Sequence, residues 1–261
     1  MTLAYARTGT GAPLVLIHGL GHRRQGWDAV VPRLAAERDV IAVDLPAMGE
    51  SPPPAVGDPN TMADMVEKLF GELGLERPAV AGNSLGGLIA LELAARGTVS
   101  SAVALSPAGF WNRPERWWCI AVFRIAGLLG ARLPDGAVER IVGNRFSRAA
   151  LFGLFFGRPG RHPAADLTRD LRGLGREHRP AIDAALAELD RWRPPAPPAA
   201  GVPATIAWGR RDLLLFPHQA RRARRALPGA RFVALPGCGH APMADDPELV
   251  VKVLLEASRP A

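Results

Sequence analysis

The sequence of 261 residues contains only two cysteines and no long uninterrupted run of apolar residues. Cys119 and Cys238 lie far apart along the chain, so they form no disulfide framework, and they suit a reducing compartment. The most apolar stretch, 117–133, is interrupted by Arg124 and is shorter than the ~20 apolar residues that a membrane span requires. The first residues carry no apolar signal core. We therefore expect a cytoplasmic protein without a membrane-spanning segment.

Lysine is scarce as well. Lys68 and Lys252 are the only lysines, so the net charge of +7 comes from arginine. The arginines are scattered among many Ala, Gly and Pro residues, a composition that GC-rich coding explains without a nucleic-acid partner. Their densest cluster, within 221–225, lies on an expected surface helix. A solvated helix face is the simpler interpretation, and binding to an anionic surface is the alternative. No DNA- or RNA-binding motif accompanies the cluster, so we expect no nucleic-acid partner.

The order of elements along the chain indicates an α/β fold. Apolar residues make up 48% of the chain and charged residues 22%, as in ordinary globular proteins, and the length suits one domain. Short apolar runs alternate with amphipathic helical stretches, which is typical of a mostly parallel sheet with helices on both faces. The expected strands are 3–7, 14–17, 40–44, 79–82, 102–105, 204–208 and 232–235. The expected helices are 27–37, 62–73, 85–96, 219–226 and 247–256.

The alternation of strands and helices breaks between residues 110 and 192, where the sequence is helical or irregular and rich in Trp, Phe and Arg. A proline-rich link, 194–198, closes this stretch, and the alternation then resumes. We expect one core formed by 1–109 and 199–261, with a helical cap, 110–198, inserted between its two parts. The aromatic side chains of the cap predict an apolar roof over a pocket.

The stretch GNSLGG at 82–87 lies between an expected strand and an expected helix and contains the G-x-S-x-G pattern of a nucleophile elbow. In such an elbow a strained turn lifts the serine hydroxyl clear of the sheet. Gly82 and Gly86 have no side chains to clash where the strand and the helix meet. The N-terminus of the helix offers free N–H groups to developing negative charge. Ser84 is therefore the candidate nucleophile.

A serine hydroxyl is a weak nucleophile, so it needs a base, and the base needs a third group that orients it. His240 lies in a glycine-rich loop after the last expected strand, and Asp212 follows the strand before it. The carboxyl ends of parallel strands meet at one edge of a sheet, where such a site would form. The stretch 106–110, before the cap, has no carboxylate to replace Asp212. Asp245 and Asp246 are interpreted as N-terminal charges of the last helix.

The elbow and the order Ser84, Asp212, His240 resemble the α/β-hydrolase superfamily, in its branch of small capped bacterial serine esterases and lactonases. Cofactor-free haloperoxidases and carbon–carbon bond hydrolases are similar too. The resemblance covers both core segments. It implies the α/β-hydrolase fold, with a mostly parallel central sheet, helices on both faces and a helical cap inserted after the sixth strand.

Two loops extend the resemblance. His18-Gly19 resembles the family's oxyanion loop. The stretch 44–51 resembles the D-x-P-G-x-G-x-S loop that supports it, with Ala47 in place of the usual glycine. By this resemblance the backbone N–H groups of Leu20 and Leu85 form the oxyanion hole, whose donors stabilise the charge that develops in the transition state.

Four residues are candidates for binding the substrate, namely His18, Gly19, Phe110 and Trp111. His18 is expected to order its loop rather than to act as a base. The spacing of His18 and His22 indicates no metal site, because no third or fourth ligand accompanies the pair. We expect no metal and no cofactor. The expected partner is a small-molecule substrate, and the chain is expected to be a monomer or a homodimer.

The resemblance implies that a carboxylic ester, a lactone or a thioester is hydrolysed through an acyl-enzyme, as in carboxylesterases. The apolar cap favours a small, fairly hydrophobic substrate. Haloalkane dehalogenases and epoxide hydrolases of this fold use an aspartate nucleophile, and position 84 is serine. Three alternatives stay open. They are a carbon–carbon bond hydrolase, a cofactor-free haloperoxidase on the same three residues, and a non-catalytic binding protein of this fold.

Overall fold

The computed structural model describes residues 2–259, and its centre is a seven-stranded sheet in the order β1-β3-β2-β4-β5-β6-β7. The strands are β1 (Tyr5–Thr8), β2 (Ala12–Ile17), β3 (Arg38–Val43), β4 (Ala79–Asn83), β5 (Ser101–Leu105), β6 (Ala204–Gly209) and β7 (Arg231–Leu235). β1 pairs antiparallel with β3, and all other neighbours are parallel. The expected mostly parallel α/β sheet is therefore confirmed.

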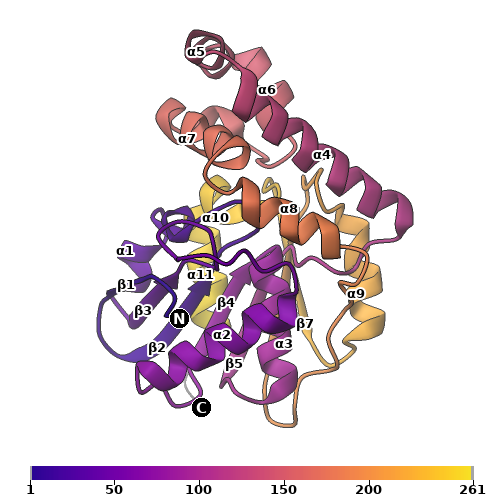
Figure 1. The fold of residues 1–261 in the computed structure, drawn as a ribbon. Coiled ribbons are helices and arrows are strands. Elements are labelled where there is room, and N and C mark those ends of the chain that lie inside the picture. The colour runs from indigo at the N-terminus through magenta and orange to yellow at the C-terminus, as the bar shows by residue number, and fades with distance from the viewer. Residues whose placement is uncertain (1, 260–261) are drawn as a thin grey trace.

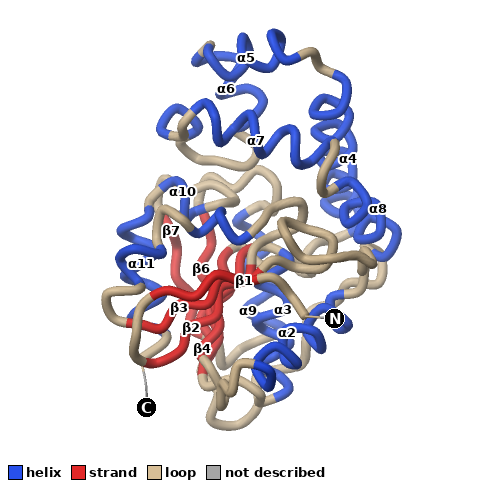
Figure 2. Tube along the Cα trace, turned by 60° about the vertical axis from the view of Figure 1, so that its left-hand side comes forward, coloured by secondary structure: helices blue, strands red, loops and turns tan. Residues whose placement is uncertain are grey.

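Helices cover both faces of this sheet (Figure 2). The helices of the core are α1 (Val31–Leu34), α2 (Pro59–Glu72), α3 (Leu85–Arg96), α9 (Ala220–Ala226), α10 (Pro242–Asp245), α11 (Pro247–Ala257) and the 3₁₀ helices η1 (Arg24–Trp27) and η3 (Pro217–Gln219). Successive residues of β2 point into two different apolar cores. Val15 packs on the side of α2 and α3, and Leu16 packs on the side of α1 and α11. Burial on both faces explains why the inner strands β2 to β6 are largely apolar runs, whereas the edge strands β1 and β7 are more exposed.

A helical segment between β5 and β6 stands over one edge of the sheet (Figure 1). It contains α4 (Arg113–Arg132), α5 (Asp135–Gly143), α6 (Arg145–Phe152), η2 (Pro159–Arg161), α7 (Ala164–Gly175) and α8 (Arg179–Glu188). The segment follows the fifth strand of the chain, not the sixth, so the strand count taken from the family resemblance was one too high. Within residues 2–259, no helix is both long enough and apolar enough to span a membrane.

The single helix expected around 27–37 is shorter in the structure, where η1 and the one-turn helix α1 take its place. Pro32 explains the late start of α1, because proline has no N–H to donate to a carbonyl one turn earlier. Trp27 and Leu34 are nevertheless completely buried in the apolar core on the side of the sheet that α1 and α11 cover.

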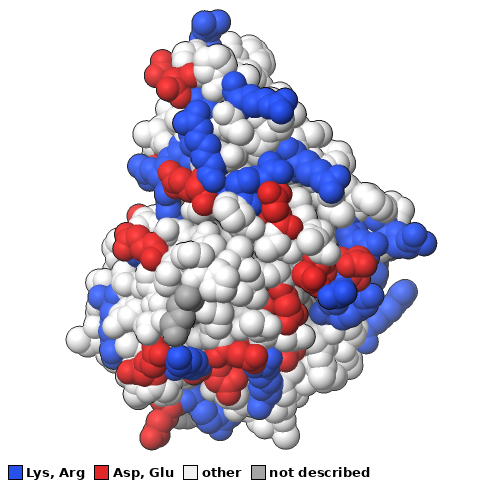
Figure 3. Space-filling model, viewed as in Figure 1, with Lys and Arg blue, Asp and Glu red and all other residues white. Residues whose placement is uncertain are grey.

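The root of the helical segment is fixed to the core by a buried carboxylate. Asn112 and Glu115 form a capping box at the start of α4, and Glu115 also binds Arg222 of α9 and His218. Arg222 further donates to the Phe110 carbonyl at 2.5 Å. Arg222 is therefore partly buried, whereas Arg221, Arg224 and Arg225 of the same cluster are exposed, as expected for a solvated helix face. On the face shown in Figure 3, basic and acidic side chains are interspersed.

Candidate active site

Ser84 occupies the turn between β4 and α3. Its backbone has φ +55° and ψ −113°, and few residues other than glycine adopt such a positive φ. The Ser84 N–H donates to the Leu105 carbonyl at 2.9 Å, and the Ser84 carbonyl accepts from the N–H groups of Leu88 and Ala108, both at 3.0 Å. The strained turn expected of a nucleophile elbow is therefore present. Ser84 lies at the tip of this turn and lines a pocket.

Gly82 and Gly86 allow β4 and α3 to approach each other closely. A Cβ at Gly82 would overlap the carbonyl of Gly86, and a Cβ at Gly86 would overlap the carbonyl of Ile17 at the end of β2. A side chain at Gly82 would push β4 and α3 apart, and a side chain at Gly86 would push α3 away from the end of β2. The reason given from the sequence for these two glycines is thus confirmed.

His240 and Asp212 meet at the carboxyl ends of β7 and β6. The Nδ1 atom of His240 lies 2.9 Å from Oδ2 of Asp212, whose side chain is completely buried. The other carboxylate oxygen, Oδ1, accepts the N–H groups of Leu214 at 3.0 Å and Leu215 at 2.8 Å. Backbone donors therefore compensate the buried charge, and an Nδ1–H that donates to Asp212 leaves Nε2 as the free acceptor of the ring.

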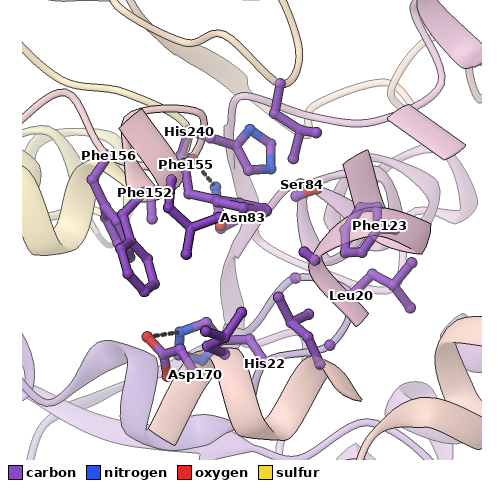
Figure 4. Close-up of a pocket in the computed structure, with 18 residues that line it drawn as sticks. Leu20, His22, Asn83, Ser84, Phe123, Phe152, Phe155, Phe156, Asp170 and His240 are labelled. Atoms are coloured by element: carbon purple, nitrogen blue, oxygen red, sulfur yellow. Dashed lines mark hydrogen bonds and ion pairs between the residues drawn. The ribbon is translucent and has the colours of Figure 1, made fainter. Parts of the chain in front are cut away.

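The backbone of the His240 loop is tied to two other parts of the chain. Its N–H donates to the Phe155 carbonyl at 2.7 Å, and its carbonyl accepts from Nδ2 of Asn83 at 2.8 Å. Figure 4 shows His240 and Ser84 on the same side of the pocket. Within the described residues, no hydrogen bond joins the Ser84 hydroxyl to His240. In ligand-free active sites this contact often tightens only when the substrate binds.

The turn that follows β2 runs beside Ser84. A Cβ at Gly19 would lie 3.2 Å from Cβ of Ser84, and both Gly19 and Leu20 line the pocket. Leu85 is the first residue of α3, where the N–H has no carbonyl one turn earlier to bind. The structure therefore brings both segments that carry the expected N–H donors next to the serine.

His18 is buried behind this turn and does not line the pocket. Its ring joins two loops, because Nδ1–H donates to the Gly19 carbonyl at 2.8 Å and Nε2 accepts the N–H of Leu45 at 3.0 Å. Burial lowers the pKa of His18 to about 3, so the ring is the neutral form that these two bonds require. His18 thus joins its loop to the loop that follows β3, and of the pair His18-Gly19 only Gly19 lines the pocket.

His178, just before α8, makes a second bridge of the same kind. Its Nδ1–H donates to the Gly21 carbonyl at 2.8 Å, and its Nε2 accepts the N–H of Gly49 at 3.3 Å. Burial lowers the pKa of His178 as well. No motif marks this histidine in the sequence, because only the packing of the helical segment on the two loops brings it there.

The loop 44–51 keeps the shape that the family pattern implies. Ala47 adopts φ +56°, so an alanine holds the left-handed conformation for which the pattern has glycine. The Ser51 hydroxyl donates to the Asp44 carbonyl at 2.7 Å, and the Asp44 carboxylate binds Arg24. The loop therefore supports the turn after β2 despite the substitution.

The pocket over Ser84 is mostly apolar, with an empty volume of ≈ 700 Å³ including its opening to solvent. Its apolar side chains come largely from the helical segment, namely Phe123, Ala126, Leu151, Phe152, Phe155, Phe156, Leu171 and Leu174. Phe110 and Trp111, which were expected here, lie elsewhere. Phe110 packs edge-on against Trp208 of β6. Trp111 stacks on Trp192 of the same helical segment, and Trp192 in turn donates to the Gly57 carbonyl of the core.

Asp245 has a larger part than a helix-terminal charge. It is buried, and it accepts the N–H groups of Gly157, Arg158 and Gly239 at 2.7–2.8 Å. Burial alone would raise its pKa, but His162 and the three N–H groups outweigh burial and lower it. Asp245 thus joins the helical segment to the residue before His240, which corrects the expectation. Asp246 does cap α11, because it accepts the N–H of Leu249 at 3.2 Å.

Comparison with known proteins gives a consistent result. A model of the alpha/beta hydrolase family matches residues 14–253. An uncharacterized protein of Mycobacterium tuberculosis is 29% identical, over 99% of this chain and 79% of that protein. An epoxide hydrolase of the same species is 30% identical, over 74% of this chain and 91% of its own length. The solved structure of an esterase from Thermogutta terrifontis is 25% identical, has a TM-score of 0.74, and aligns over 97% of this chain and 92% of that one.

Proposed function

This chain belongs to the alpha/beta hydrolase family, and we propose that it is a serine hydrolase that cleaves an ester-like bond through an acyl-enzyme on Ser84. The observation that supports this most is the positive-φ Ser84 at the start of α3, in one pocket with a His240 ring that Asp212 holds at 2.9 Å. A nucleophile, a base and an orienting acid are the three parts that acyl transfer needs.

In the proposed first step the Ser84 hydroxyl attacks the carbonyl carbon of the ester while Nε2 of His240 takes its proton. Asp212 stabilises the resulting imidazolium. The N–H groups of Leu20 and Leu85 stabilise the oxyanion of the tetrahedral intermediate. The intermediate collapses when His240 returns the proton to the leaving alcohol. A water, deprotonated by the same histidine, then attacks the acyl-enzyme, and the acid leaves as Ser84 regains its proton.

The alternative suggested by the epoxide hydrolase relative needs a different nucleophile. Epoxide hydrolases of this fold attack with a carboxylate, and this chain has a hydroxyl at position 84. The esterase from Thermogutta terrifontis supports ester cleavage instead. The apolar wall of the pocket supports a substrate with a hydrophobic acyl or alcohol portion. We propose that α4–α8 act as the cap that forms this wall.

The test is a panel of p-nitrophenyl esters of graded chain length, with lactones, a thioester and a carbon–carbon-cleavable dienone alongside. Wild type should hydrolyse esters of short to medium chain, and Ser84→Ala should abolish turnover while the protein stays folded by circular dichroism. Dienone cleavage without ester turnover would replace the proposal with a carbon–carbon hydrolase. Ester turnover that survives in Ser84→Ala would refute the nucleophile.

A further inference from the structure

The pocket has polar side chains at two separate places. Asn83, Ser84 and His240 form one group, and His22 and Asp170 form the other. Figure 4 shows the second pair across the cavity from Ser84, with Phe152 and Phe156 along the wall between them. The first group takes part in the proposed chemistry, whereas nothing in that chemistry uses His22 or Asp170. In a mostly apolar pocket, a few placed polar groups fix which ligands bind.

His22 directs its Nε2 atom toward Asp170 at this end of the pocket. Its Nδ1 accepts the N–H of Arg23 at 2.9 Å, a shorter contact than the 3.2 Å to the Arg23 carbonyl. A ring that accepts at Nδ1 carries its proton on Nε2 when it is neutral. The ring also packs directly on Gly26, where a Cβ would lie only 2.7 Å from it. We therefore assign the proton of the neutral ring to Nε2, the nitrogen that faces Asp170.

The Asp170 carboxylate has an open hydrogen-bonding capacity. Its Oδ2 lies 3.8 Å from Nε2 of His22, which is too far for a direct hydrogen bond. Within residues 2–259 the Asp170 carboxylate accepts no hydrogen bond. The arginine next to each member of the pair is used elsewhere. Arg169, which adjoins Asp170, binds Asp166 at 3.1 Å, and Arg23, which adjoins His22, pairs with Glu177 at 3.6 Å. A water or a hydroxyl group can bridge two polar partners at this separation.

We propose that His22 and Asp170 form a hydroxyl-binding subsite, so that the preferred ester carries a hydroxyl group away from the bond that is cleaved. A hydroxyl accepts from Nε2–H of His22 and donates to the Asp170 carboxylate at the same time. An ammonium group only donates, and the charge of Asp170 repels a carboxylate. The pair also borders an outer groove, so the hydroxyl binds where the pocket meets that groove. This inference rests on the proposed function, whose substrate class it narrows.

The experiment compares esters of the same chain length with and without a terminal hydroxyl, from butanoate to octanoate, in the acyl portion and in a parallel series in the alcohol portion. At the length that reaches the subsite, kcat/KM should be at least about tenfold higher for the hydroxylated ester, the gain that a hydrogen bond to a charged group provides. Asp170→Ala should remove this preference, mainly through KM. If the alanine variant does not fold, Asp170→Asn replaces it. Asparagine keeps the side-chain shape, and this variant should weaken the preference for the hydroxylated ester.

Asp183→Ala is the matched control, because Asp183 lies on α8 of the same helical segment, carries the same charge and lines neither the pocket nor the outer groove. It should keep the preference. A preference absent at every length in both series, or unchanged in Asp170→Ala, would overturn the subsite.

A binding arm separates this failure from failure of the proposed function. Ser84→Ala protein is titrated calorimetrically with a plain alcohol and with the diol of the same length. The diol should bind at least about tenfold tighter. Equal affinities would refute the subsite whether or not esters are turned over.

Discussion

Two aspartate–histidine pairs border the same pocket and are built in opposite ways. In the Asp212–His240 pair the atoms lie 2.9 Å apart, the aspartate is completely buried, and both carboxylate oxygens are hydrogen-bonded. In the Asp170–His22 pair the atoms lie 3.8 Å apart, and the aspartate side chain is 26% exposed. A saturated pair can only hold its ring in place, whereas an open pair keeps hydrogen bonds for a ligand. The same two residue types thus serve orientation at one end and recognition at the other.

The largest effect is expected from a substitution in the Asp212–His240 pair, which we call the saturated pair. Asp212→Asn should lower kcat by roughly 10⁴, because the ring of His240 then takes the wrong tautomer and its positive charge is no longer stabilised. The loss should be the same for plain and hydroxylated esters, since the carboxylate faces the histidine and not the cavity. Steady-state kinetics on folded, monodisperse protein measures it. More than about a tenth of wild-type kcat remaining in this variant would place the acid elsewhere.

The same aspartate-to-asparagine substitution in the Asp170–His22 pair, which we call the open pair, should have a different effect. Asp170→Asn should change the ratio of kcat/KM between hydroxylated and plain esters, and it should act mainly on KM. Equal losses of kcat for both substrates, as in Asp212→Asn, would mean that the two pairs have the same role.

The sequence predicted the saturated pair and missed the open one for a physical reason. Ser84, Asp212 and His240 each follow a strand of the parallel part of the sheet, and parallel strands bring such residues to one edge of a sheet. Asp170 and His178 reach the pocket and its loops only through the packing of the helical segment on the core. That packing depends on contacts between distant segments, which leave no local pattern.

The aromatic residues of the helical segment show the same limit. Phe110 and Trp111 are as apolar as Phe123 and Phe155, and the sequence alone does not tell which of them face the pocket. The inner strands β2 to β6 were predictable because burial on both faces leaves largely apolar runs.

A third aspartate, Asp245, stabilises the loop of His240 from outside the pocket, because it accepts the N–H of Gly239. Asp245→Asn should lower the free energy of unfolding by about 1–3 kcal/mol, because an amide nitrogen would face one of the buried N–H groups that the carboxylate now accepts. Asp246→Asn is the matched neighbour and should cost only a few tenths of a kcal/mol, since Asn caps a helix about as well as Asp. Urea denaturation of both variants measures the difference. Equal stabilities would contradict the role assigned to Asp245.

The turn after β2, which runs from His18 to His22 and joins the two ends of the pocket, should become less stable in acid. His18 has a pKa of about 3 in the folded chain and an ordinary value of 6.5 when unfolded, so the unfolded state binds the proton more readily. Its contribution to stability is therefore complete above pH 6.5 and is lost progressively as the pH falls toward 3. His18→Ala should be less stable at neutral pH, and its stability should fall less steeply below pH 6.5. A variant with the wild-type pH dependence would exclude His18 as the titrating group.

The smallest expected effect concerns the loop that supports this turn. Ala47→Gly should raise the free energy of unfolding by at most about 1 kcal/mol, because glycine adopts a positive φ without steric cost but loses more entropy on folding. A thermal melt measures the change. A clear loss of stability would show that the Ala47 methyl group contributes packing that outweighs the backbone strain.

The central claim is that the saturated pair activates Ser84, and covalent labelling tests it most directly. The wild-type protein is treated with an organophosphonate, its mass is measured, and the adduct is mapped by peptide sequencing. We expect one adduct, on Ser84, that is absent from Ser84→Ala and much slower to form in Asp212→Asn. Ser106→Ala is the control, because Ser106 is another buried serine with positive φ at a strand end, and it should label like wild type. Folded wild-type protein that stays unlabelled, or an adduct on another residue, would contradict the account.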